Sequence, residues 1–298
     1  MTGPETGRLT AFAPAKINLT LRAGPPRADG YHPVQSLVVF ADWGDTLHAS
    51  PASDLSLQLE GPFAQALAGD SHNLVLKAAW ALRAAADRPQ LGARLVLDKQ
   101  LPLASGMGGG SADAAAALRV LNDLWELGFS TRALAEIGSV VGADVPACVW
   151  SRPLLMEGIG EEIRVLPAWP ELNAVIVNPG RPVSTPDVFA ALDQDSDRKG
   201  FGALARLPVA GDPAAALALA AAGQNDLEAA AMTLEPAISD VLAELNAFRA
   251  VRLARMSGSG ASCFALTDDA AAAEGVAMAI AGNHPGWTVR AVRLAGAA

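Results

Sequence analysis

The sequence predicts an α+β protein, in which helices cover one face of a mostly antiparallel sheet. Three observations carry this prediction. Strand-type alternation of apolar and polar residues fills about the first fifty residues, and helical spacing then dominates the middle of the chain. The end of the chain has the pattern of strand, turn, strand, helix and strand. With 298 residues, of which 51% are hydrophobic, the chain can build two modest domains.

The elements of the first half follow from periodicity and turn residues. Residues 8–48 alternate as strands do, and a turn at residues 24–30 (GPPRADG) interrupts them. The remaining elements expected here are strand 54–60, helix 73–86, strand 93–98, helix 111–125 and helix 130–141.

Beyond Trp150 the pattern changes, and we place the boundary between two domains there, giving domains 1–150 and 151–298. No repeat of fixed period is apparent. The order expected in the second domain is strand 154–163, strand 173–178, helices between 186 and 248, strand 252–256, turn 257–260, strand 261–266, helix 269–281 and strand 288–294.

Composition argues against several classes of partner. A net charge of −9 and a pI near 4.9 argue against nucleic acid. No apolar stretch free of glycine and charge is long enough to span a bilayer, and no N-terminal run resembles a signal peptide. Cys148 and Cys263 lie in apolar surroundings and are expected to be free thiols, as in a reducing compartment. We therefore expect a cytoplasmic protein without membrane or nucleic-acid partners, either monomeric or homodimeric.

A glycine-rich segment at residues 101–118 (LPLASGMGGGSADAAAAL) is the most informative feature of the chain. Gly106, Gly108, Gly109 and Gly110 precede a helix that Ser111 opens, so side chains are absent where the helix exposes unpaired N–H groups. Such amides and the positive end of the helix dipole bind phosphate together. No lysine follows, as a P-loop requires, and no βαβ unit closes, as a dinucleotide site requires. The segment predicts a phosphate cradle, and a plain strand-to-helix turn is the alternative.

Three shorter motifs carry further chemistry. Lys16 and Asn18 share one face of an expected strand, although an edge-strand lysine with its head in water has the same spacing. Asp144 follows a helix and stands near Pro146, as a turn or cap residue often does, and its apolar setting also suits a carboxylate base. Residues 257–260 (SGSG) form either a simple hairpin or a turn that lets backbone approach a phosphate.

Taken in order, these motifs resemble those of the GHMP kinases (galactose, homoserine, mevalonate and phosphomevalonate kinases). Two departures are Met107, where the family usually has leucine, and Ala112, where a second serine is common. The resemblance covers nearly the whole chain, and it implies an N-terminal nucleotide-binding and catalytic lobe and a C-terminal ferredoxin-like lobe. It is carried by residues 14–19 (PAKINL), 28–32 (ADGYH), the glycine-rich segment, 142–146 (GADVP), 157–161 (EGIGE) and 257–260 (SGSG).

The resemblance also implies an activity. Residues 28–32 are similar to the segment of the branch that phosphorylates 4-diphosphocytidyl-2-C-methyl-D-erythritol on its 2-hydroxyl, in the non-mevalonate route to isoprenoid precursors. ATP would be the donor and Mg²⁺ would bridge its phosphate oxygens, with no metal ligand assigned. Asp144 would accept the hydroxyl proton. Lys16 would lie near Asp144 and the γ-phosphate, keeping the carboxylate ionised and offsetting charge on the transferring group.

The binding residues that the resemblance implies fall into two sets. Tyr31, the only tyrosine, would stack on the cytosine, Phe189 would cover the other face of the base, and His32 would hydrogen-bond its edge. Asn18 would orient the hydroxyl. Gly258 and Gly260 complete the substrate-binding set. The ATP-binding set is Leu103, Ala104, Ser105, Gly106, Met107, Gly108, Gly109, Gly110 and Ser111 in the loop, with Lys99, Asn73 and Leu74 at adenosine-pocket positions; Leu74 could equally be a core residue.

Two alternatives remain open. One is a GHMP kinase for another small alcohol, such as mevalonate, homoserine or a sugar, but these substrates carry no base for Tyr31 to stack on. The other is a catalytically silent protein of this fold that binds nucleotide and regulates a partner. The presence of both Lys16 and Asp144 argues against it.

Overall fold

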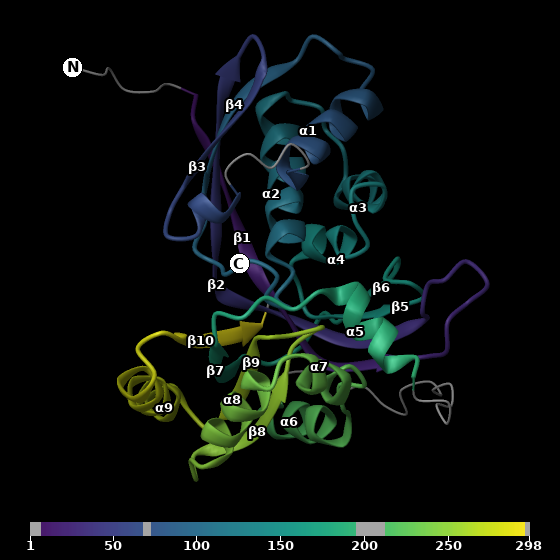
Figure 1. Cartoon of the computed structure of the whole chain (residues 1–298). Helices are drawn as coiled ribbons and strands as arrows, with labels where there is room; N and C mark the ends of the chain where they lie inside the picture. The colour runs from purple at the N-terminus through teal and green to yellow at the C-terminus, as the bar shows by residue number, and fades with distance from the viewer. Residues whose placement is uncertain (1–6, 68–72, 195–211, 296–298) are drawn as a thin grey trace. The chain divides into compact units, whose positions relative to one another are not determined.

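The computed structural model describes residues 7–67, 73–194 and 212–295 (Figure 1). The chain forms two compact units from interleaved segments. Unit 1 takes residues 1–15, 43–103 and 109–150, and unit 2 takes residues 16–42, 104–108 and 151–298. Two long strands, β1 (Leu9–Ala23) and β2 (Val34–Ala52), therefore contribute to both units.

Unit 1 combines strands with a group of helices. Strand β4 (Gly92–Asp98) pairs antiparallel with the second half of β2, and β3 (Leu55–Glu60) pairs parallel with β4. In Figure 1 the four α-helices of this unit lie along one side of these strands. The helical elements are η1 (Ala64–Leu67), α1 (Leu74–Ala85), α2 (Gly109–Leu124), α3 (Thr131–Ser139) and α4 (Val145–Trp150).

Side-chain caps define where two of these helices begin. Asn73 Oδ1 accepts the N–H of Val75 at the start of α1, and the Ser130 hydroxyl accepts the N–H of Ala133 at the start of α3. Helix α2 has an alanine-rich sequence because it is buried on most sides: residues 112–118 are all buried. Small side chains let its neighbours α1 and α4 pack close to it.

Unit 2 contains a four-stranded antiparallel sheet in the order β10-β7-β9-β8. The chain order is strand, helices, strand, strand, helix, strand, which is the ferredoxin-like arrangement, so the prediction for the C-terminal lobe is confirmed. The first part of β2 pairs with β10 on one edge and with β5. The elements are β7 (Leu172–Asn178), α5 (Thr185–Leu192), α6 (Pro213–Ala222), α7 (Glu228–Leu234), α8 (Ala237–Asn246), β8 (Val251–Met256), β9 (Cys263–Thr267), α9 (Ala270–Asn283) and β10 (Thr288–Ala295).

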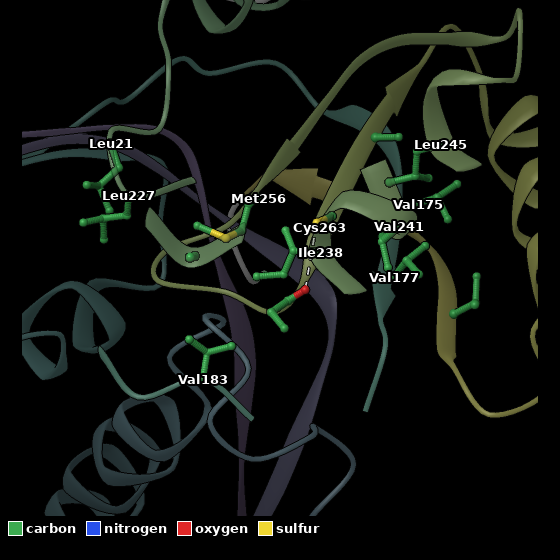
Figure 2. Packing of buried hydrophobic residues seen from close by; sticks show 14 of the residues in the cluster. Leu21, Val175, Val177, Val183, Leu227, Ile238, Val241, Leu245, Met256 and Cys263 are labelled. Atoms are coloured by element: carbon green, nitrogen blue, oxygen red, sulfur yellow. Dashed lines mark hydrogen bonds between the residues drawn. The ribbon is translucent and has the colours of Figure 1, made fainter. Parts of the chain in front are cut away.

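The core of unit 2 lies between this sheet and its helices (Figure 2). Val175 and Val177 of β7 pack with Ile238 and Val241 of α8, and Met256 ends β8 in the same cluster, all fully buried. Burial of an aliphatic side chain of this size contributes about 1.5–3 kcal/mol to stability. The turn at residues 257–260 therefore leaves from a firmly packed strand.

Two sequence predictions need correction. The single strand expected over residues 154–163 is wrong, since β5 (Leu154–Glu157) and β6 (Glu162–Val165) form an antiparallel pair. Gly158 (φ 71°) and Gly160 (φ 114°) make the turn between them in a backbone region that favours glycine. Helix α4 was not predicted, because six residues are too few to show a helical period. Within the described ranges, no helix is long and apolar enough to cross a membrane.

Candidate active site

Lys16 and the glycine loop are in direct contact within unit 2. The N–H of Lys16 donates to Met107 O at 2.8 Å, which attaches β1 to the loop. Gly108 has φ +63°, and a Cβ added there would lie 3.1 Å from Lys16 Cε and 3.3 Å from Lys16 Cβ. The absence of a side chain at residue 108 therefore lets Lys16, which is 3% exposed, run against the loop.

The turn at residues 257–260 packs against the other side of this contact. A Cβ added to Gly106 would lie only 2.3 Å from Ser257 O, and one added to Gly258 would lie 2.6 Å from Gly106 O. The Ser257 hydroxyl donates to Gly106 O at 3.2 Å, and Ser262 N–H donates to Ser105 O at 3.1 Å. Gly260 (φ +89°) completes the turn. The structure thus brings the predicted cradle and the second small-residue turn together.

Asn18 connects β1 to the same turn. Its backbone N–H donates to the Ser257 hydroxyl at 3.1 Å, and its side-chain Nδ2 donates to Ser36 Oγ at 2.7 Å. Asn18 is fully buried, and its Oδ1 has no hydrogen-bond partner among the residues that the structure describes. A buried acceptor left without a donor is destabilising by about 1–3 kcal/mol, so this oxygen is suited to receive a ligand hydroxyl.

Asp144 belongs to unit 1, where it is half-buried and precedes α4. Its backbone carbonyl accepts the N–H of Cys148, which forms the first turn of that helix. Arg119 of α2 holds the other end of α4 by donating to Cys148 O at 2.8 Å, and it also donates to Phe12 O at 2.7 Å. Burial lowers the pKa of this guanidinium, yet its bonds to carbonyls compensate for lost hydration. Asp144 therefore lies at the start of a helix whose far end is held by Arg119.

Lys99 lies in the interior of unit 1, between two carboxylates. It is 1% exposed, and its Nζ donates to Asp45 Oδ2 at 2.5 Å and to Asp113 Oδ2 at 2.6 Å. Burial alone would lower the pKa of Lys99, but attraction to Asp113 and Asp45 outweighs it and raises the pKa. The ammonium is therefore already engaged, and the adenosine contact expected of Lys99 stays a prediction.

The other residues predicted for the adenosine pocket lie at the start of α1. Asn73 is 7% exposed and caps this helix through its side chain. Leu74 is half-buried, and a Cβ added to Gly110 would lie 3.3 Å from its Cδ1, so Leu74 adjoins the first turn of α2. The remaining loop residues are Leu103, half-buried, Ala104, exposed with φ 46°, Gly109 and Ser111, both half-buried.

Two of the predicted base-binding residues, His32 and Phe189, are in contact. The ring of His32 stacks on that of Phe189 with centroids 4.7 Å apart and an interplanar angle of 28°. His32 Nδ1 lies 3.0 Å from Gly24 O, and its Nε2 lies 3.3 Å from Asp193 Oδ2. Tyr31 is 58% exposed, and its backbone N–H donates to Asp29 Oδ1. The side chain of Tyr31 is thus largely exposed, while His32 already has partners at both ring nitrogens.

Several residues of this region were not predicted. Ser257, Ser36 and Asp113 act through bonds to residues far away in the sequence, which no local pattern reveals; only the small-residue turn pointed to Ser257. No group of three or more His, Cys, Asp or Glu suited to a metal ion occurs in the described part of the chain. No residue of this chain is therefore assigned as a Mg²⁺ ligand.

Comparison with known proteins shows what the chain is similar to. The family model described as GHMP kinases N terminal domain matches residues 73–152, and that described as GHMP kinases C terminal matches residues 181–284. The 4-diphosphocytidyl-2-C-methyl-D-erythritol kinase of Methylorubrum extorquens is 49% identical, over 96% of this chain and 99% of that protein. The kinase of the same name from Rhodopseudomonas palustris is 47% identical, over 98% and 99%. A crystal structure of 4-(cytidine 5'-diphospho)-2C-methyl-D-erythritol kinase matches with a TM-score of 0.76 and 32% identity, over 97% of this chain and 100% of that one.

Proposed function

The chain belongs to the GHMP kinase family, and we propose that it transfers the γ-phosphate of ATP to the 2-hydroxyl of 4-diphosphocytidyl-2-C-methyl-D-erythritol, in the non-mevalonate route to isoprenoid precursors. Relatives that are 44–49% identical over nearly their whole length carry the name of this kinase. The family relation makes the chain an ATP-dependent kinase, and the relatives' name supports this substrate over another small alcohol.

One structural observation carries the kinase activity. The side chain of Lys16 runs against Gly108 of the phosphate-type loop, and the turn at residues 257–260 packs on the same loop. A cation beside oriented loop backbone is what a transferring phosphoryl group requires, because charge spreads over its equatorial oxygens in the transition state. A glycine turn that served packing alone would not need a buried lysine beside it.

The proposed chemistry is an in-line displacement at the γ-phosphorus. Asp144 accepts the proton of the 2-hydroxyl, the hydroxyl oxygen bonds to phosphorus, and the bond to the β-phosphate oxygen breaks to release ADP. Lys16 offsets negative charge on the phosphoryl group. Asn18, through its unpartnered Oδ1, accepts a hydrogen bond from the polyol and orients it. A Mg²⁺ ion bound together with the nucleotide would supply neutralisation of phosphate charge, and no residue of this chain is assigned to hold it.

Nucleotide binding is proposed for the loop and the start of two helices. Loop residues 103–111 offer backbone amides to the phosphates, and Asn73, Leu74 and Lys99 are assigned to the adenosine pocket. A side chain at residue 110 would crowd Leu74, because a Cβ there would lie 3.3 Å from Leu74 Cδ1. Such amides at the N-terminus of α2 favour phosphate.

Substrate binding is proposed for the residues that distinguish a cytidyl compound. Tyr31 offers an exposed ring on which cytosine can stack, and Phe189 and His32 form a stacked pair that borders the base. Gly258 and Gly260 are assigned to the diphosphate of the substrate, because without side chains their backbone can come close to it. Because both nitrogens of His32 already have partners, its hydrogen bond to the base requires His32 to exchange one of them.

The remaining expectations are part of the proposal. We assign residues 1–150 and 151–298 to the N- and C-terminal family domains. Two buried free thiols, Cys148 and Cys263, support work in the reducing cytoplasm. The enzyme works as a monomer or homodimer on a small molecule, without nucleic acid.

An ADP-release assay tests the proposal. The purified chain with Mg-ATP receives 4-diphosphocytidyl-2-C-methyl-D-erythritol, mevalonate or homoserine, and phosphorus NMR identifies the product. Turnover with the cytidyl compound alone, giving a new phosphomonoester, is expected. Turnover with another alcohol would keep the kinase but overturn the roles of Tyr31 and His32. ATP binding without turnover on any of the three would favour the regulatory alternative.

A further inference from the structure

The buried cluster of Asp45, Lys99 and Asp113 lies within unit 1 and has no part in the chemistry above beyond the adenosine contact assigned to Lys99. Each of the three residues is at most 3% exposed. Removing an ammonium and carboxylates from water is unfavourable unless hydrogen bonds compensate. The contacts of the cluster indicate what it is for.

The cluster joins the two ends of the glycine loop. Lys99 precedes the loop and Asp113 follows it, fourteen positions later, so the bond between Lys99 Nζ and Asp113 Oδ2 closes the loop at its base. Asp45 of β2 fixes the entry side, because its Oδ1 accepts the N–H groups of Gln100 at 2.6 Å and Leu101 at 2.8 Å. Both ends of the loop are thus held to one strand.

The ammonium of Lys99 also lies against the first residue of α2. A Cβ added to Gly109 would lie 3.2 Å from Lys99 Nζ. Asp113 stands on the next turn of the same helix, so Lys99 contacts α2 at two levels. The first turn of a helix presents the free N–H groups that bind phosphate, and their direction follows the direction of that turn.

We propose that Asp45, Lys99 and Asp113 are positioning residues that hold the first turn of α2 ready for the phosphates of the nucleotide. The proposal depends on the proposed function only for the identity of that nucleotide. A loop that is ordered before binding loses less conformational freedom when the ligand arrives. Loosening the cluster therefore weakens nucleotide binding, while binding of the second substrate is unaffected.

Substitution of Asp113 gives the most specific test of this proposal. Its Oδ1 has no hydrogen-bond partner within the described residues, and burial raises the pKa of its carboxyl to about 8, against the attraction of Lys99, with Asp45 raising the pKa further. An uncharged asparagine of the same shape keeps a side-chain oxygen that can accept from Lys99 Nζ, as Asp113 Oδ2 does. An alanine cannot reach Lys99 at all.

The experiment compares D113A, D113N and V120A in the full chain at pH 7. Val120 is a buried residue of the same helix outside the cluster, so V120A reports general destabilisation of α2. For each variant, ADP affinity is measured by calorimetry, KM is measured for ATP and for the cytidyl substrate, and thermal unfolding checks that the chain is folded. If D113A does not fold, D113S, whose hydroxyl is too short to reach Lys99, replaces it.

We expect D113A or D113S to weaken ADP binding and raise KM for ATP about ten-fold or more, with KM for the second substrate within two-fold. D113N should restore most of the affinity, and V120A should lower the unfolding temperature without moving KM for ATP. The proposal is overturned if D113A resembles V120A, or if both KM values rise together. ADP affinity needs no turnover, so failure of the proposed reaction and failure of this inference remain distinguishable.

Discussion

The side chain of Lys16 passes Gly108 so closely that a single methyl group on residue 108 would stand 3.1 Å from Lys16 Cε. This contact joins residues 14–19 to the glycine-rich segment, because Lys16 also donates its N–H to Met107 O. The position of the lysine is thus set by the loop that is proposed to hold phosphate, and a change in the loop reaches the ammonium directly.

Gly108→Ala should therefore lower activity more than its effect on stability explains. Both Gly108 (φ +63°) and Gly128 (φ +72°) have backbone angles that disfavour alanine by about 1 kcal/mol, but nothing lies within 4 Å of a Cβ on Gly128. We expect both variants to unfold at similar temperatures and G108A alone to lose about ten-fold or more in kcat/KM. Equal activity of G108A and G128A would show that Lys16 does not depend on this contact.

Asp144→Asn should reduce kcat by about 10²–10⁴-fold, the range for removing one general base, because an amide cannot accept the hydroxyl proton. ATP affinity should change little, since Asp144 has no assigned contact with the nucleotide. Steady-state turnover and equilibrium binding of ADP measure the two effects separately. Unchanged turnover in D144N would remove Asp144 from the mechanism.

Tyr31→Ala should raise KM for the cytidyl substrate by about 5- to 150-fold, because stacking on a base contributes roughly 1–3 kcal/mol. Tyr31→Phe keeps the ring and should stay near the wild-type value. Since the side chain is 58% exposed, neither change should lower the unfolding temperature measurably. A KM for ATP that rises in parallel would show that Tyr31 does not serve the base.

Asp113 should make stability depend on pH. The folded chain holds the carboxyl proton up to a pKa of about 8, whereas the ordinary value is 3.8. Between these values the folded state binds more protons than the unfolded state, so the free energy of unfolding falls as pH rises from about 4 to 8. Urea unfolding at pH 5, 6.5 and 8 should show a fall larger by at least about 1 kcal/mol in wild type than in D113N. Parallel curves would contradict the raised pKa.

Local features of the sequence were enough to predict most elements and the phosphate-type loop. Four glycines ahead of an alanine-rich run define the start of α2 within two residues, because both signals are local. The pairing of β5 with β6 was missed because the turn at Gly158 and Gly160 lies inside what reads as one apolar strand. Strand order required the family resemblance, since pairing depends on residues far apart in the chain.

The residues that support the site were harder to predict than those of the motifs. Ser257 donates to Gly106 O across 151 positions, and its hydroxyl accepts from Asn18 N–H across 239. The resemblance assigned Lys99 to the adenosine pocket, and nothing near it in the sequence shows that Asp45, 54 positions earlier, and Asp113 surround it. Such contacts appear only when the chain is folded.

The interleaving of the two units limits how this chain can be divided. Leu21 and Ala23 of β1 belong to the hydrophobic cluster of unit 2, although its other members among the described residues all follow residue 174. A fragment that begins at residue 151 would lack this strand and would expose the surfaces that it covers. Recombination between related genes that keeps unit 2 intact must therefore exchange residues 16–42 and 104–108 together with the C-terminal half.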